Sequence, residues 1–163
     1  MTEALAIREK HDGALGDRSS VKLWLRLLSC TIAMEKDVQR RFASRGATLA
    51  RFDVLAALDR DGDGMNMGAL SRALLVSNGN VTQLVQKLVK DGLVRIAPSP
   101  ADRRASIVHL TSRGRAAFTS LAVAHHDWID GLLAGVDAET RETLYHALGA
   151  LKRSIAKGQS LGS

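Results

Sequence analysis

Apolar residues recur every three or four positions over most of the chain, which predicts a mainly helical protein. A wide apolar stripe covers residues 20–45, and Gly46 is placed to end that helix. Thr48 is placed to cap a second helix, whose inner face carries Phe52, Leu55 and Leu58. Two short helices are expected at 68–74 and 78–91. Two long helices follow, one from 111 to about 134 after a capping Thr111, and one after a capping Asp137 with Leu144, Leu148, Leu151 and Ile155 along its inner face.

The period changes to two in a short part of the chain. Residues 93–96 and 106–110 read as strands on either side of a turn that holds both prolines, and 65–67 read as a brief strand. The element order is helix, helix, strand, helix, helix, strand, turn, strand, helix, helix. A helix-turn-helix followed by a β-hairpin predicts a mainly α fold with a small antiparallel β-wing, a winged helix-turn-helix.

The helix after Ser77 has an unusual polar side. Ser77 is placed to cap it, and no acidic residue occurs between Ser77 and Lys90. Amide and hydroxyl side chains hydrogen-bond base edges in the major groove, and lysines contact phosphates. The alternative is a solvated helix face that is rich in amides. The predicted DNA-binding residues are Ser77, Asn78, Asn80, Thr82, Gln83, Gln86 and Lys87, with Gly79 and Lys90 on the same side.

The turn between the last two strands reads PSPADRRAS, residues 98–106. Its prolines stiffen the turn and so reduce the entropy lost on binding. Asp102 is placed to orient one of Arg103 and Arg104, which leaves the other for the narrow, electronegative minor groove. The alternative is a solvated turn with a local ion pair.

The run LSRALLVSNGNVTQLVQKLVKDGLVRIAPSPADRRASIVHLTSRGRA, residues 70–116, resembles the MarR family of winged helix-turn-helix transcription regulators. The segment GATLARFDVL, residues 46–55, is similar to the start of the family's second helix, and the likeness extends over roughly 20–157. Gly79 departs from the usual Ser or Thr, and Arg51 from a common Gln.

The resemblance implies a homodimer joined by helices at 20–45 and 111–158, with a DNA-binding region at 46–110. Residues 1–19, which are polar and contain glycine, are expected to form a loose arm ahead of them. The resemblance also implies a pseudo-palindromic operator read in successive major grooves, with each wing in a flanking minor groove. It also favours Arg104 as the partner of Asp102 and Arg103 as the inserted side chain. Release from DNA by a small, often phenolic or aryl-acid ligand is a further implication.

The charge of the 163-residue chain agrees with a polyanionic partner. The formal net charge is +6, and the sequence pI is about 10.0. The single cysteine, Cys30, allows no intramolecular disulfide and fits a reducing compartment. No apolar run approaches the roughly 20 residues of a membrane span, and the N-terminus lacks a signal-peptide pattern. A cytoplasmic protein is expected.

Other chemistry finds little support. The segment DRDGDG, residues 59–64, matches the first half of a calcium loop, but the position for the bidentate Glu is Leu70. The histidines, including the adjacent His125 and His126, lack metal-ligand spacing. No nucleophile triad or phosphate loop is evident. We therefore expect no metal, no cofactor and no enzymatic activity.

Three questions stay open at this stage. Candidate effector-contacting residues are Trp24, Leu28, Phe52, His125 and Trp128, joined by Arg40, Arg41 and Arg51 from a cationic group that also includes Lys36 and Arg45. That group is either a solvated, DNA-attracting face or a binding site for the phosphates of a larger effector, such as an aryl-coenzyme A thioester. Cys30 is expected to be a buried thiol, with oxidant sensing as the alternative. The rival to a DNA-binding regulator is a winged-helix module for protein contacts.

Overall fold

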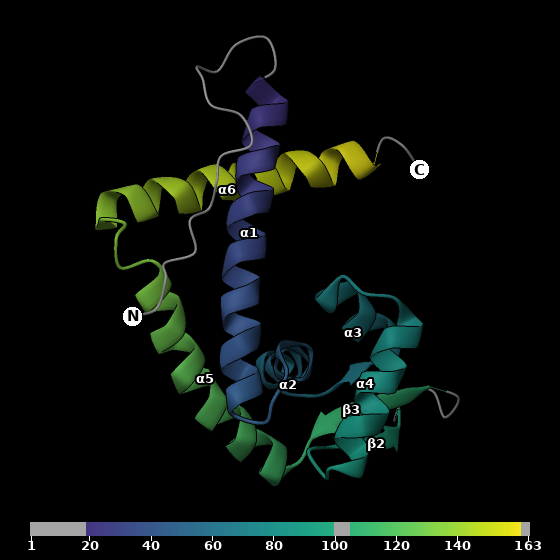
Figure 1. Cartoon of the computed structure of the whole chain (residues 1–163). Helices are drawn as coiled ribbons and strands as arrows, with labels where there is room; N and C mark the ends of the chain where they lie inside the picture. The colour runs from purple at the N-terminus through teal and green to yellow at the C-terminus, as the bar shows by residue number, and fades with distance from the viewer. Residues whose placement is uncertain (1–18, 100–104, 161–163) are drawn as a thin grey trace. The chain divides into compact units, whose positions relative to one another are not determined.

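The computed structural model describes residues 19–99 and 105–160, and it confirms a mainly helical chain with a small antiparallel sheet (Figure 1). Within these ranges no helix is both long and apolar enough to span a bilayer. The elements run in the predicted order: α1 Ser19–Ser44, α2 Leu49–Asp61, β1 Met65–Asn66, α3 Met67–Leu74, α4 Asn78–Lys90, β2 Val94–Pro98, β3 Ser106–Leu110, α5 Ser112–Leu132 and α6 Ala138–Ser160.

The predicted helix caps are confirmed. Thr48 Oγ1 accepts from the backbone N–H of Arg51 at 3.3 Å, and Ser77 Oγ accepts from that of Asn80 at 3.4 Å. Asp137 accepts from the backbone N–H of Thr140 at 2.8 Å. Each bond satisfies a donor that the first turn of a helix leaves without a partner, so the sequence positions of these caps set where the helices begin.

The described residues form two compact units, one that ends at His126 and one that starts at Asp127. In the first unit, α2, α3 and α4 pack against a sheet of order β1-β3-β2, and α4 contacts the edge strand β2 (Figure 1). Strand β3 pairs with β2 in the register Val94↔Leu110 to Pro98↔Ser106. The core that holds these elements together consists of Val54, Leu55, Leu58, Leu70, Val81, Val85, Leu88, Val94 and Val108.

The base of the wing is tied to the start of α5. The Thr111 hydroxyl donates to the carbonyl of Gly92 at 2.7 Å and accepts from the backbone N–H of Gly114 at 3.0 Å. The backbone N–H of Thr111 donates to the carbonyl of Leu93 at 3.1 Å. Gly114 is buried against that same carbonyl, since a Cβ at this position would lie 1.9 Å from the Leu93 oxygen. The LTSRG sequence, residues 110–114, therefore couples the end of α4, the base of the hairpin and α5 at one junction.

Two expectations about burial need correction. Cys30 is exposed on α1, not buried, because only Val38 and Phe42 of that helix are buried within the chain. The apolar stripe of α6 is not an inner face of the single chain either. Leu144, Leu148 and Ile155 are exposed, and none of residues 138–158 is buried.

Candidate nucleic-acid interface

Helix α4 presents the predicted polar face to solvent. Val81, Val85 and Leu88 are fully buried beneath it and hold the helix on the core. Within the helix every ionisable side chain is basic. Below, the polar face of α4 denotes its exposed polar side chains: Asn78, Asn80, Gln83, Gln86, Lys87 and Lys90.

Two of the predicted DNA-binding residues have their hydroxyls engaged within the helix. The half-buried Thr82 donates to the carbonyl of Asn78 at 2.8 Å, and Ser77 serves as the cap. These two residues stabilise the first turn, so the amides and lysines supply the accessible polar groups. Gly79 lies exposed among them, and nothing in the described structure lies within 4 Å of where its Cβ would stand. The surface there is open to close approach by a partner.

The end of α4 is held by an ion pair that sequence analysis missed. The Arg51 guanidinium, from the first turn of α2, donates to the carboxylate of Asp91, the residue that ends α4. Both side chains are only partly buried. The two residues are 40 positions apart in the sequence, so no local pattern predicts this pair. Arg51, a candidate effector contact by sequence, links α2 to the end of α4.

The wing is an antiparallel hairpin up to the limit of what the structure describes. The backbone N–H of Ser99 donates to the carbonyl of Ala105 at 2.8 Å, one step beyond the Pro98↔Ser106 pair. Asp102, Arg103 and Arg104 lie outside the described residues, so their predicted roles stay predictions.

Phe52 and His125, two candidate effector contacts, meet in an aromatic cluster. The His125 ring lies 4.9 Å from that of Phe52 and 5.8 Å from that of Phe42, and Phe118 lies 5.5 Å from Phe52. Phe42 and Phe52 are buried, so this cluster joins α1, α2 and α5 as packing. The other aromatic and apolar candidates are not brought into it: Trp24 is exposed, Leu28 is half-buried on α1, and Trp128 belongs to the second unit.

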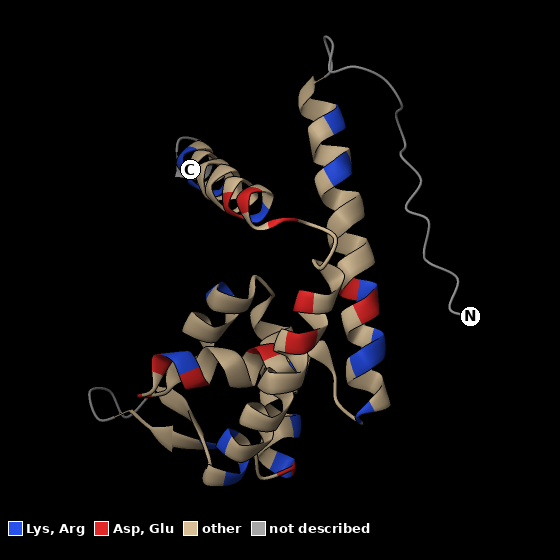
Figure 2. Ribbon diagram, turned by 90° about the vertical axis from the view of Figure 1, so that its left-hand side faces the viewer, with Lys and Arg blue, Asp and Glu red and all other residues tan. Residues whose placement is uncertain are grey.

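The cationic group on α1 is partly neutralised. Arg40 and Arg41 both pair with Asp37, one turn earlier on the helix. Figure 2 shows acidic and basic residues side by side along this part of α1. Exposed pairs of this kind contribute little to stability, and they reduce the net positive charge available to an anionic ligand.

Burial lowers the pKa of His125 below its ordinary value of 6.5, and the charge of neighbouring His126 lowers it further. The folded protein therefore binds this proton less tightly than the unfolded chain does. The free energy of unfolding is therefore highest above about pH 6.5, where His125 is neutral in both states. It decreases as the pH falls towards the pKa of the folded state. We expect His125→Phe to reduce the drop in Tm between pH 7.5 and 5.5. The exposed His146→Phe serves as the control, and an equal drop in all three proteins would contradict the assignment.

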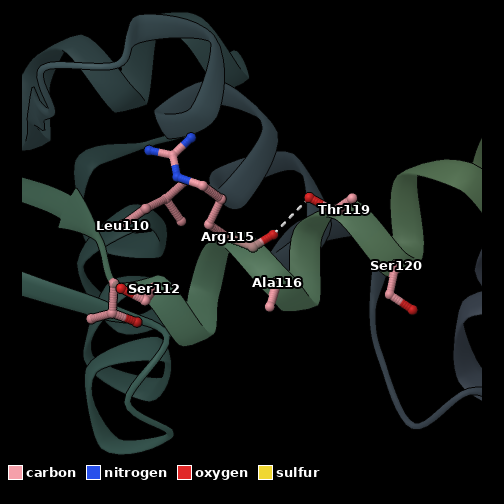
Figure 3. Close-up of a pocket in the computed structure, with 7 residues that line it drawn as sticks. Leu110, Ser112, Arg115, Ala116, Thr119 and Ser120 are labelled. Atoms are coloured by element: carbon pink, nitrogen blue, oxygen red, sulfur yellow. Dashed lines mark hydrogen bonds between the residues drawn. The ribbon is translucent and has the colours of Figure 1, made fainter.

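A shallow hollow of about 770 Å³ runs along the first three turns of α5 (Figure 3). Its lining includes Ser112, Ala116, Thr119 and Arg115. Arg115 already pairs with Asp59 at 2.6 Å, and the Thr119 hydroxyl donates to the carbonyl of Arg115 at 3.0 Å. These groups are satisfied within the chain, so the hollow is a less favourable candidate site than the polar face of α4.

Comparisons with known proteins agree with this geometry. A family model described as MarR family matches residues 45–105. The transcriptional activatory protein BadR of Rhodopseudomonas palustris is 36% identical over 103 residues, which span 62% of this chain and 59% of BadR.

Two solved structures extend the likeness to the whole fold. A MarR family transcriptional regulator from Silicibacter pomeroyi is 34% identical with a TM-score of 0.74, over 86% of this chain and 99% of that one. A mutant MarR from E. coli, complexed with operator DNA, has a TM-score of 0.73 at 22% identity, over 86% of this chain and 99% of that one. The second likeness concerns the fold alone.

Proposed function

The chain belongs to the MarR family of transcriptional regulators, and from this premise we propose that it is a repressor that binds a pseudo-palindromic operator as a homodimer and leaves it when a small effector binds. The observation that carries the proposal is the polar face of α4. It is exposed, free of acidic residues and placed second in a helix-turn-helix, the position of the helix that enters the major groove. The net charge of +6 favours the same partner.

The homodimer is supported by α6. Leu144, Leu148 and Ile155 recur on one side of this helix and are 45–53% exposed in the single chain. A contiguous apolar face of this kind marks an interaction surface. A symmetric dimer covers one such face with its own copy, and it presents two reading helices to the two half-sites of a palindrome.

The wing completes the proposed interface. Arg103 is assigned to the minor groove and Arg104 to a charge-assisted pair with Asp102, as the family resemblance favours. The described strands β2 and β3 support this assignment only by pairing as an antiparallel hairpin as far as Pro98 and Ser106. The wing extends contacts beyond the major groove and so adds to the small area that one helix buries.

The effector is proposed to be anionic or aromatic, such as an aryl acid or its coenzyme A thioester. Arg40 and Arg41, which share Asp37 as a partner, are the proposed contacts of its anionic group, and the exposed Trp24 is the proposed contact of its aromatic ring. Repression follows physically if the dimer occupies promoter DNA that the polymerase needs. BadR carries the word activatory in its name, so activation is the alternative outcome of a transcription assay.

A mobility-shift assay tests the proposed roles on α4, with the DNA upstream of the protein's own gene and a random duplex of equal length. We expect Gln83→Ala to weaken specific binding by about 1–3 kcal/mol and leave random binding unchanged, because an amide reads a base edge. Lys90→Ala should weaken binding to both duplexes alike, because Lys90 is expected to contact phosphate. It should also reduce the slope of log K against log salt concentration by about one per subunit.

The same assay separates the rival functions. If both variants lost specific and random binding to the same degree, the side chains of α4 would not be recognising bases. A complete absence of sequence-specific binding at physiological salt would favour a winged-helix module for protein contacts. Addition of aryl acids and their thioesters to the preformed complex tests release.

A further inference from the structure

Leu75, in the turn between α3 and α4, is in the left-handed region of backbone space, with φ 55° and ψ 36°. Among the described residues it is the single non-glycine residue with a positive φ. The surrounding hydrogen bonds determine this conformation. The backbone N–H of Val76 donates to the carbonyl of Ser71 at 3.2 Å, and the Ser71 hydroxyl donates back to the carbonyl of Val76 at 2.5 Å.

A leucine is a poor choice for this position on two counts. The left-handed conformation places its Cβ against the backbone, a strain that glycine avoids and asparagine tolerates. The side chain is also 92% exposed, so it gains no hydrophobic stabilisation within the chain. Strained residues persist where the conformation serves a function. Folding alone does not account for Leu75, which indicates a contact with another molecule.

The position of the turn identifies the partner. Leu75 lies two residues before Ser77, the cap of α4, and three before Asn78, the first residue of the exposed polar face. In a helix-turn-helix, the N-terminal residues of the second helix come closest to the base edges. The feature that an aliphatic side chain recognises in the major groove is the C5-methyl group of thymine.

We propose that Leu75 makes an apolar contact with a thymine methyl group of the operator and adds a sequence preference that the amides of α4 do not supply. This inference rests on the proposed function. It explains why a strained, solvent-exposed leucine stands directly before the reading helix.

The test compares Leu75→Gly with Leu75→Met, which keeps a flexible apolar side chain. The full-length wild-type protein first selects a tight-binding duplex from a random-sequence pool. The thymines of that duplex are then replaced one at a time by deoxyuridine, which lacks the methyl group. Affinities are measured for each duplex and for a random duplex, and Tm is measured without DNA.

We expect Leu75→Gly to raise Tm by about 2–4 °C, because the strain is released. The same variant should bind the selected duplex about tenfold more weakly and the random duplex unchanged. One deoxyuridine replacement should lower the affinity of the wild-type protein and of Leu75→Met by a similar factor. It should leave the affinity of Leu75→Gly unchanged. Higher stability combined with weaker specific binding is an outcome that a purely structural role does not produce.

Two results would overturn the proposal, and they differ from failure of the proposed function. If Leu75→Gly binds the selected duplex as tightly as the wild type, or if it loses as much affinity to deoxyuridine as the wild type does, the methyl contact does not exist. If no duplex is enriched from the pool, the protein is not a sequence-specific DNA-binding protein, and both proposals fail together.

Discussion

Replacement of Gly114 by alanine is expected to lower the stability of the protein by about 3 kcal/mol, the upper part of the range for over-packing in a tight site. A Cβ at this position would stand 1.9 Å from the carbonyl oxygen of Leu93, which is backbone and cannot rotate away. Either the start of α5 or the first residues of the wing must move. For a chain of this size the change corresponds to a Tm decrease of about 6–12 °C.

DNA binding should fall with stability in this variant, because the same junction positions the wing. The Thr111 hydroxyl donates to the carbonyl of Gly92 and accepts from the N–H of Gly114, so a shift of α5 breaks contacts at the base of the hairpin, where β2 begins and β3 ends. Thermal unfolding and operator affinity are the two measurements. Below the unfolding transition, we expect the variant to bind the operator more weakly than the wild type.

Gly131→Ala is the matched control, since Gly131 lies in the same helix with nothing within 4 Å of its missing Cβ. Alanine favours helix over glycine by about 0.5–1 kcal/mol, so this control should gain stability or stay unchanged. If Gly114→Ala retained the wild-type Tm, the close approach between α5 and Leu93 would not be a constraint on the fold.

Features that depend on neighbouring residues could be predicted from the sequence. The caps Thr48, Ser77 and Asp137 act on N–H groups three residues away, and the structure shows all three bonds. The change from helical to strand period located the hairpin, and apolar residues at helical spacing opposite amides and lysines located the polar face of α4. In each case the pattern and its physical cause lie within a few residues of each other.

Features that depend on contacts across the chain could not be predicted. The Arg51–Asp91 pair joins residues 40 positions apart, and nothing around either residue indicates the other. The motif that contains Gly114 was evident as a pattern. The reason for its glycine is the backbone carbonyl of Leu93, the residue before β2, which leaves no space for a Cβ. The left-handed conformation of Leu75 was likewise hidden, because leucine is not a residue that marks such a turn.

An apolar stripe indicates that a helix face is covered. It does not indicate whether the same chain or another molecule covers it. The periodicity of α6 predicted an inner face, whereas the chain leaves Leu144, Leu148 and Ile155 exposed. The expected burial of Cys30 failed for the same reason on α1. Both errors come from treating an apolar stripe as a face that the same chain covers, and a second copy of the chain is the cover that we propose for α6.

Leu148→Glu is therefore expected to dissociate the proposed dimer and to abolish tight operator binding. The substitution removes the burial of a leucine and places a charge in an apolar interface, and two-fold symmetry doubles the effect. A loss of at least about 4 kcal/mol raises the dimer dissociation constant about 1,000-fold. Sedimentation equilibrium measures that constant, and a mobility shift measures operator affinity.

Ala150→Glu adds the same charge on the opposite side of α6, two residues away, where the alanine is exposed. A helix turns about 100° per residue, so residue 150 faces well away from the stripe that contains Leu148. This control should remain dimeric and bind the operator normally. Dissociation of both variants would mean that added charge, not the apolar face, weakens assembly. A dimer that survives Leu148→Glu would mean that other surfaces join the two subunits and that the exposed stripe of α6 serves a different partner.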